Sequence, residues 1–140
     1  MSQSAHGEVL IAGAGTGGPA LVLTRPISFW GGVDPKSGRI VDPRHPEAGE
    51  SVAGRVLFLP GTIGSSSASA VLLELVRAGL APAAILLPAP AAILLLGLIV
   101  AREMGWSHPL ALRLDRRRHK AFGGRHVEVC ADGRISAKGR

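Results

Sequence analysis

The residues best suited to chemistry lie in one short segment, Gly64-Ser65-Ser66-Ser67-Ala68-Ser69. An apolar run at residues 55–59 precedes this segment and a helical pattern follows it, which places its hydroxyls and backbone N–H groups at the carboxyl edge of a predicted sheet. Backbone N–H groups and the positive end of a helix dipole stabilise an anion at such a position. The same field would stabilise a serine alkoxide, so one of these hydroxyls could act as a base.

A structural interpretation of the same segment is also open. Serine is a favoured N-cap residue, and the serines could simply secure the start of the helix. Capping needs only one hydroxyl, however, and the neighbouring Gly61 and Gly64 indicate close approach of the backbone to another group. The residues alone leave both interpretations standing.

Other short motifs have the spacing of a known site but lack the context that its chemistry needs. Gly13-x-Gly15-x-x-Gly18 has the dinucleotide-binding spacing, but Pro19 and a strand-like pattern follow where a helix should begin, so we interpret it as a glycine-rich turn. Residues 60–67 lack the lysine of a phosphate-binding P-loop. Asp34 and Asp42 each precede a proline, and we interpret both as turn-forming residues.

The metal-ligating residue types are few and scattered. The chain has one cysteine, Cys130, which cannot form an internal disulfide or hold a zinc or iron–sulfur site by itself. The five histidines have no metal-ligand spacing. We therefore predict that no metal or cofactor is bound by this chain alone, and the single cysteine fits a reducing compartment.

The elements that position the serine segment are predicted from hydrophobic patterning. Apolar residues at positions 68, 71, 72, 75 and 76 form one face of a helix that ends at Gly79, and a second helix is predicted over 91–104. Strands are predicted at residues 8–12, 20–24, 27–30, 39–42, 55–59, 83–87, 110–114, 126–130 and 134–136. This order predicts the α/β class, with an α/β layer packed against a strand-rich layer.

Length and composition limit the chain to one domain. The 140 residues are 46% hydrophobic and 19% charged, enough for a core built from aliphatic residues. Residues 1–100 carry six basic and six acidic side chains, whereas residues 101–140 carry ten and four, so the net charge of +6 lies in the last forty positions. We predict one domain over 1–140 with a basic portion at 115–140 and a frayed tail at 137–140.

The basic cluster Arg116-Arg117-Arg118-His119-Lys120 is interpreted as a solvated loop or a rim that meets an acidic partner. No aromatic residues are interleaved with these charges, so we predict no nucleic-acid partner. Residues 80–101 are uncharged, but three prolines in their first half would break a membrane-spanning helix. The N-terminus lacks the pattern of a signal peptide, and we expect a cytoplasmic protein with no membrane contact.

Three stretches carry a resemblance to a known family. Residues 26–42, PISFWGGVDPKSGRIVD, residues 54–60, GRVLFLP, and residues 64–74, GSSSASAVLLE, resemble the small, swivelling part of the aconitase X family. The likeness covers residues 20–107 and extends to the hairpin at 127–135. It implies a single swivelling β/β/α domain, as in the small C-terminal domains of aconitases, and at this length a separate small subunit that works with an aconitase X-type large subunit.

The resemblance also implies a lyase that removes water from a hydroxy acid. A base takes the proton α to a carboxylate while the β-hydroxyl leaves, and an iron–sulfur cluster or iron centre in the large subunit acts as the Lewis acid. In aconitases the base is the first serine of a Gly-Ser-Ser-Arg string, which matches Ser65 after Gly64 here. Ser67 stands where the arginine would be, so the carboxylate clamp is expected from the large subunit. Gly64, Ser66 and Ser67 are the expected substrate-binding residues.

The substrate is expected to be cis-3-hydroxy-L-proline, which would yield pyrroline-2-carboxylate. The Ala-, Arg- and Gly-rich composition is common in GC-rich bacterial genomes, and bacterial members are similar to hydroxyproline dehydratases. The alternative is mevalonate 5-phosphate, the substrate of archaeal members. An alternative of another class is a non-catalytic interaction module whose basic tail contacts nucleic acid or a membrane. Trp30, Gly31 and Gly32 could shape the cleft, although an aromatic buried beside a tight turn is the interpretation we favour.

Overall fold

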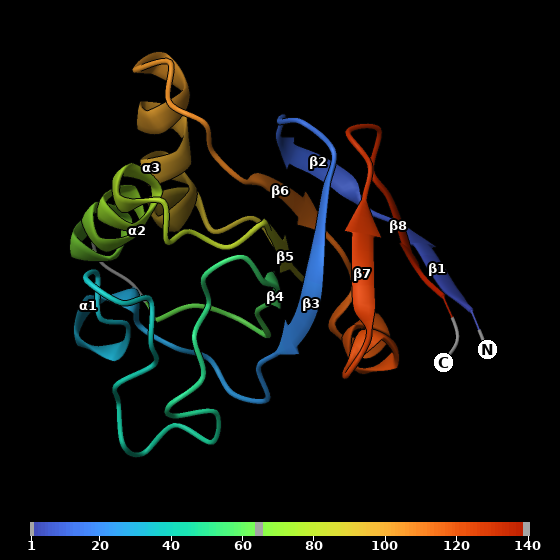
Figure 1. The fold of residues 1–140 in the computed structure, drawn as a ribbon, viewed down its shortest axis with the longest axis horizontal. Coiled ribbons are helices and arrows are strands. Elements are labelled where there is room, and N and C mark those ends of the chain that lie inside the picture. The colour runs from blue at the N-terminus through green and yellow to red at the C-terminus, as the bar shows by residue number, and fades with distance from the viewer. Residues whose placement is uncertain (1, 64–65, 139–140) are drawn as a thin grey trace.

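The computed structural model describes residues 2–63 and 66–138, which form one curved sheet with three α-helices on one side and a short 3₁₀ helix on the other (Figure 1). The strands are β1 (Gln3–His6), β2 (Glu8–Ile11), β3 (Thr16–Val22), β4 (Val56–Phe58), β5 (Ala84–Leu87), β6 (Leu110–Arg113), β7 (His126–Val129) and β8 (Arg134–Ala137). The helices are the short α1 (Phe29–Gly32), α2 (Ser66–Ala78), α3 (Ala92–Glu103) and a 3₁₀ helix, η1 (Arg116–Phe122). The predicted α/β class and the swivelling β/β/α architecture are both confirmed.

The centre of the sheet consists of parallel strands that are covered on both faces. β3, β4, β5 and β6 pair in parallel, as expected for strands connected through helices. Alternate residues of these strands point to opposite sides. Leu57 and Ile85 join the core beneath the helices, whereas Val56 and Phe58 join a second core on the other face. This double burial explains why residues 56–59 and 83–87 are continuous apolar runs.

The antiparallel strands curl the sheet toward closure. The strand order is β1-β8-β7-β3-β4-β5-β6-β2, so β1 and β2 lie at opposite edges although only Gly7 separates them in sequence. The N–H of Gly7 donates to the carbonyl of Gly133 at 2.8 Å. A Cβ at Gly7 would lie 3.0 Å from the carbonyl oxygen of Arg113 and 3.1 Å from the Cβ of Leu112, so a residue without a side chain suits this crossing point.

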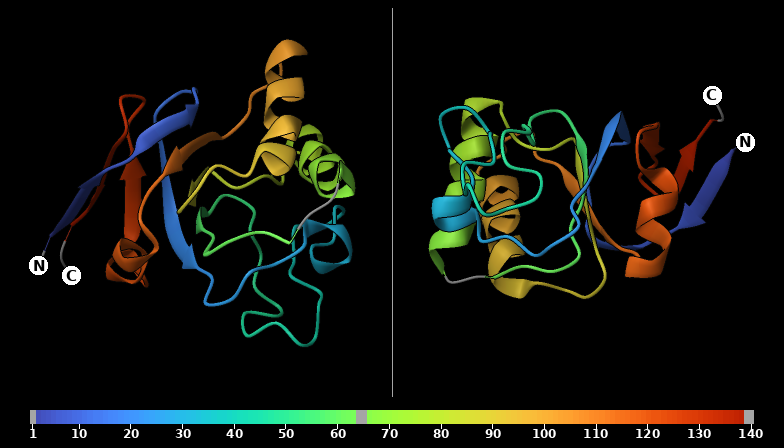
Figure 2. Two further views of the ribbon diagram at one scale, coloured as in Figure 1. Left: turned by 180° about the vertical axis from the view of Figure 1, so that it is seen from behind. Right: turned by 90° about the horizontal axis from the view of Figure 1, so that it is seen from below.

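The helices form a separate layer. α2 and α3 pack on each other and cover one face of the parallel strands, while η1, β7, β8 and β1 lie on the other side (Figure 2). Gly97 in α3 permits a close approach, because a Cβ there would lie 2.6 Å from the carbonyl oxygen of Ser69 in α2. α2 ends as predicted at Gly79, which has a φ of 74° in the left-handed region.

Several predicted elements differ from the structure. The glycine-rich turn is shorter than expected, because β3 begins at Thr16 and Gly17 and Gly18 pair with β7. Residues 27–30 do not form a strand; Ile27 makes an isolated bridge to Thr62 and a helical turn, α1, follows. Residues 39–42 make only isolated bridges.

The N-terminal strand β1 and the helix η1 were not predicted at all. β1 is not apolar, and it forms because its backbone pairs with β8. We predicted a frayed tail at residues 137–140, and its first residue differs from that prediction. Ala137 is the last residue of β8 and pairs with Gln3 and Val127. Among the described residues, no helix is long and apolar enough to cross a membrane.

Candidate active site

The candidate site lies at the carboxyl edge of the parallel strands, where two helices begin. The chain leaves β4 at Phe58 and enters α2 at Ser66, and it leaves β5 at Leu87 and enters α3 at Ala92. Because β4 and β5 are neighbours in the sheet, the positive ends of α2 and α3 meet at one place. The N-cap residue of α3 is Ala91, whose side chain cannot accept a hydrogen bond. The first backbone N–H groups of α3 therefore have no bond from a capping side chain of this residue.

The predicted catalytic residue Ser65 and the predicted substrate-binding residue Gly64 lie outside the described residues. The chain is described up to Ile63 and again from Ser66, which is the first residue of α2. Ser67 follows in the first helical turn and is half-buried. The serine segment is therefore flanked on one side by a cavity-lining residue and on the other by the start of a 13-residue helix.

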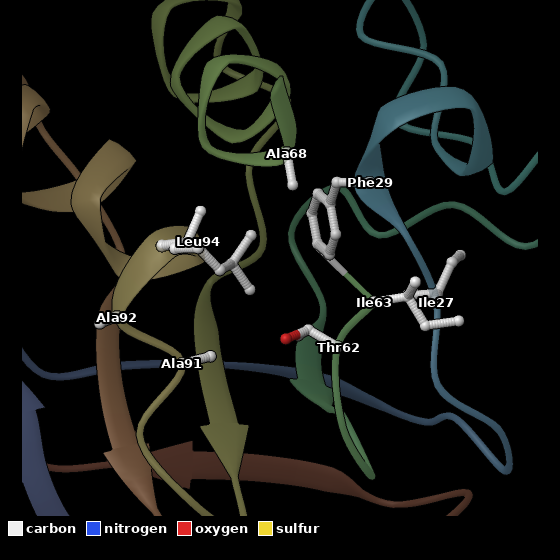
Figure 3. A pocket seen from close by; sticks show the side chains of 9 residues that line it. Ile27, Phe29, Thr62, Ile63, Ala68, Ala91, Ala92 and Leu94 are labelled. Carbon is white, nitrogen blue, oxygen red and sulfur yellow. The ribbon is translucent and has the colours of Figure 1, made fainter. Parts of the chain in front are cut away.

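A cavity of about 190 Å³ lies between these connections. Figure 3 shows its lining side chains, which come from the start of α1 and the segment before it, the loop after β4, the first turn of α2, and the start of α3 with its N-cap residue. The lining residues are Ile27, Phe29, Thr62, Ile63, Ala68, Ala91, Ala92, Ile93 and Leu94. The lining side chains are apolar apart from Thr62, although polar atoms also form a substantial part of the exposed wall. The apolar part of the wall lowers the local dielectric, which strengthens the effect of any nearby dipole or charge.

Thr62 is a site residue that the sequence analysis missed. Among the described residues that line the cavity it carries the one polar side chain, and its hydroxyl points into the space between the β4 loop and α3 (Figure 3). Its position is set by a backbone bridge to Ile27. The signal in the sequence is its place in the strand-to-helix loop, two residues before Gly64, but a lone threonine beside a run of serines is not a distinctive motif.

The long segment at residues 31–51 is tied to the connection between β3 and α1. The backbone N–H of Thr24 donates to Glu47 Oε1 at 2.7 Å, and the buried His45 ring bonds through Nε2 to the carbonyl oxygen of Arg25 at 3.0 Å. Asp34 and Asp42 accept the backbone N–H groups of Lys36 and Arg44, each at 3.0 Å. Both aspartates are turn-forming, as predicted, and these bonds hold their pKa values below the usual range.

Trp30 does not have the predicted buried environment. Its side chain is 65% exposed, and it is not among the residues that line the cavity. The buried aromatic of the segment is the adjacent Phe29, which is 1% exposed. The reason is local: Gly31 takes a φ of 77°, so a tight turn begins directly at Trp30 and directs Phe29 inward. A Cβ at Gly32 would lie 3.0 Å from Ile27 Cγ1, so this glycine permits the close packing of the turn.

The basic cluster lies at the same edge of the sheet, after β6. Residues 116–120 form part of η1 rather than the expected loop, with Arg116, Arg117, Arg118 and Lys120 exposed. Asp115 caps η1 by accepting the N–H of Arg117 at 2.9 Å. The guanidinium of Arg117 also bonds to this carboxylate at 2.8 Å, which lowers the pKa of Asp115 to about 2.

His119 anchors η1 in the second core. Its side chain is buried, lies edge-on to Phe58 at 5.4 Å between ring centroids, and bonds through Nε2 to the carbonyl oxygen of Leu114 at 2.9 Å. Because a carbonyl only accepts, Nε2 carries the proton and Nδ1 a lone pair, and Nδ1 is buried without a hydrogen-bond partner among the described residues. Burial lowers the pKa of His119 and keeps the ring neutral.

The residues that the structure describes do not fit an iron–sulfur cluster or another metal centre. Cys130 is the one cysteine and lies just after β7, outside the cavity. In the two described ranges, no group of three or more His, Cys, Asp or Glu side chains could hold a metal ion. What this edge of the chain supplies is hydroxyls, helix N-termini and an apolar cavity.

Comparisons with known proteins agree with this architecture. A family model described as the aconitase X swivel domain matches residues 4–137. The chain is 50% identical over 110 residues to the cis-3-hydroxy-L-proline dehydratase of Pseudomonas aeruginosa, and this match covers 78% of the present chain and 19% of that protein. It is 47% identical over 79 residues to the phosphomevalonate dehydratase small subunit of Methanothermobacter thermautotrophicus, covering 56% of this chain and 60% of that subunit.

The fold is also that of a solved structure. A chain in the crystal structure of Thermococcus kodakaraensis aconitase X superposes with a TM-score of 0.84 at 28% sequence identity, over 98% of this chain and 99% of that one. The present chain thus spans about a fifth of the Pseudomonas dehydratase and about three fifths of the archaeal small subunit.

Proposed function

The chain belongs to the aconitase X swivel domain family, and from this premise we propose that it is the small, swivelling component of an aconitase-like dehydratase. In this proposal it is a lyase that is active only with an aconitase X-type large subunit. The observation that carries the proposal is the loop after β4: it lines an apolar cavity with Thr62 and Ile63 and then continues through Gly64 and Ser65 into the N-terminus of α2.

Ser65 is the proposed base. Its alkoxide takes the proton from the carbon α to the substrate carboxylate, and the electron pair of that C–H bond forms the double bond as the C–O bond to the β-hydroxyl breaks. The hydroxide that leaves takes up a proton to give water, and Ser65 gives up the proton it has accepted to restore the alkoxide, so the net loss is one water. The N-terminal end of α2 stabilises the alkoxide, because the helix dipole is positive there. The proposed substrate-binding groups are Gly64, Ser66 and Ser67, whose amides and hydroxyls would donate hydrogen bonds to the substrate carboxylate.

The proposed substrate is cis-3-hydroxy-L-proline. Loss of the Cα proton and the 3-hydroxyl gives an enamine, which tautomerises to pyrroline-2-carboxylate. The 50% identity to the Pseudomonas dehydratase over 110 residues supports this choice. The cavity of about 190 Å³ is this chain's part of a site that the large subunit completes in this proposal.

The second candidate substrate is mevalonate 5-phosphate. The lengths of the relatives favour it: the match covers 60% of the archaeal phosphomevalonate dehydratase small subunit, but only 19% of the longer Pseudomonas enzyme. In length, this chain is therefore more similar to the small subunit. The exposed arginines of η1 follow β6 at the same edge of the sheet, but η1 packs on the opposite face from the cavity, so in this proposal the phosphate group is bound by the large subunit. The metal centre of either enzyme is assigned to the large subunit in this proposal, because the described residues of this chain do not fit one.

The decisive experiment is a Ser65→Ala substitution in the complex of this chain with its large subunit. Turnover of both hydroxy acids is measured by the consumption of substrate. We expect the variant to assemble normally but to lose about 10²- to 10⁴-fold in kcat, the usual contribution of a general base. The control is Ser136→Ala, which removes an exposed hydroxyl from β8 in the antiparallel part of the sheet. Turnover that survives Ser65→Ala would refute the assignment of the base.

A further inference from the structure

We propose that the exposed face of α3 is the surface on which the large subunit docks, an inference that rests on the proposed function. This face consists of Ile93, Leu96, Val100 and Met104, and we call it the α3 apolar face. The four residues follow the i, i+3, i+7, i+11 spacing of one side of a helix. Their side chains are between 38% and 59% exposed.

α3 is apolar all round, and this distinguishes it from its neighbour. Its inner side buries Leu94, Leu95 and Leu98 against the core, and its first charged residue is Arg102 near its end. A helix with apolar residues on every side is normally covered on every side. Contiguous large apolar side chains on a surface mark a site of association, whereas single ones need no explanation.

α2 provides the internal comparison, since it packs on α3 and covers the same face of the sheet. Its outward positions include Ala70, Glu74 and Arg77, and the last two form an ion pair at 3.9 Å. The outer face of α2 is therefore suited to water. The contrast between two adjacent helices points to a partner that covers α3 and leaves the outer face of α2 exposed.

The α3 apolar face is continuous with the rim of the cavity. Ile93 belongs to both. Ile63, which is 61% exposed, lines the same cavity and lies across it from Leu94 of α3 (Figure 3). A partner that completes the site with its own groups must cover the mouth of this cavity. Such a partner meets Ile93 and, one and two turns further along the helix, Leu96 and Val100.

The large subunit fits this surface better than a second copy of the chain. In the Pseudomonas dehydratase the matching part is 19% of the protein, so most of that polypeptide lies outside the matched segment and is available to cover the apolar face. A second copy would close the cavity with another apolar rim. It would add none of the acidic or metal-ligating groups that the cavity lacks among its described lining residues.

The test is a Leu96→Glu substitution, with Val100→Glu as a second variant on the next turn and Ala70→Glu on the outer face of α2 as the matched control. Affinity for the large subunit is measured by calorimetric titration, the oligomeric state of the chain alone by light scattering, and folding by circular dichroism. We expect each α3 variant to fold and to weaken the complex by more than about tenfold, as for the central residues of an interface. Ala70→Glu should bind like the wild type.

The possible outcomes separate the two proposals. If Leu96→Glu and Val100→Glu bind the large subunit like the wild type, docking on α3 is refuted while the dehydratase function stands. If the wild-type chain is itself a dimer that Leu96→Glu converts to a monomer, the face belongs to a second copy and the proposal is also refuted. A wild-type chain that forms no complex refutes both. A complex that is lost in the α3 variants but keeps turnover after Ser65→Ala supports docking and refutes the base.

Discussion

At the scale of single residues, the chemistry of this chain is that of hydroxyls next to helix N-termini. Thr62 is held in the cavity wall by its bridge to Ile27, and Ser67 is half-buried in the first turn of α2. Neither is a base at neutral pH without help. To act as a base, a hydroxyl needs an environment that lowers its pKa. The described residues provide a partly apolar cavity and the positive ends of two helices for this, and no carboxylate is among the described residues that line the cavity.

His119 leads to a prediction about pH and stability. Its pKa is lowered in the folded chain, mainly by burial, from a value of 6.5 in the unfolded chain. Its contribution to stability is therefore complete above pH 6.5 and is lost as the pH falls through the lower folded value. Protonation would place a charge on Nδ1, which has no acceptor in the described part of the chain. We expect the free energy of unfolding to fall as the pH drops below 6.5, by at most about 1.4 kcal/mol per pH unit for this one proton, until the pH passes the lowered pKa of the folded chain.

The measurement is urea unfolding at a series of pH values, compared with His119→Gln. The glutamine amide can still donate to the carbonyl of Leu114 but does not titrate, and the other four histidines are present in both proteins. The difference between the two pH profiles therefore reports His119. Parallel profiles would mean that the ring is not held neutral by burial.

At the scale of elements, the close contact of α2 and α3 sets where their N-termini meet. Gly97 permits this contact, and we predict that Gly97→Ala destabilises the chain by about 1–3 kcal/mol, as overpacking usually does. The sign is informative, because alanine normally stabilises a helix by up to about 1 kcal/mol relative to glycine.

Thermal and urea unfolding of Gly97→Ala test this prediction. Ala70→Gly, at an exposed position of α2, is the matched control and should cost only the ordinary helix propensity of about 1 kcal/mol. A Gly97→Ala variant that is more stable than the wild type would show that the helices have room to separate. In that case the two N-termini would not be fixed relative to each other by this contact.

At the scale of the whole molecule, three connections that follow parallel strands meet at one edge of the sheet. These are the loop after β4, the Pro-Ala-Pro turn after β5 and the basic helix η1 after β6. The cavity and the charge are thus at the same edge of the molecule. The arginines of η1 are partly engaged with the chain itself: Arg117 pairs with Asp115, and Arg118 donates to the carbonyl oxygen of Ser4 at 3.0 Å.

We predict that this basic surface is not a nucleic-acid site. Fluorescence titration of labelled single- and double-stranded oligonucleotides at about 150 mM salt, where only multiple phosphate contacts survive, should give no saturable binding by the isolated chain. The triple variant Arg116→Ala, Arg117→Ala, Arg118→Ala should behave in the same way. Tight binding that falls steeply with salt and disappears in the triple variant would favour the non-catalytic interaction module instead.

Much of the molecule can be predicted from local patterns, for reasons that are themselves local. The predicted strands at 55–59 and 83–87 contain β4 and β5, because short apolar runs bounded by glycine or proline are typical of strands covered on both faces. The helix from the serine segment to Gly79 follows from a 3.6-residue period and a left-handed C-terminal residue. That a single cysteine cannot hold an iron–sulfur cluster follows from composition alone.

The remaining features depend on contacts between distant residues, which no local pattern records. β1 has no apolar pattern and exists because β8 offers it a partner across more than a hundred residues of sequence. Trp30 is exposed and Phe29 is buried because of one turn at Gly31. The helix η1 is stabilised by the packing of His119 and Phe122 against Phe58. Thr62 and Ile93 line one cavity because β4 and β5 are neighbours in the sheet. Side-chain burial is a property of the assembled sheet, so the site and its proposed docking face emerge only when the strands are placed side by side.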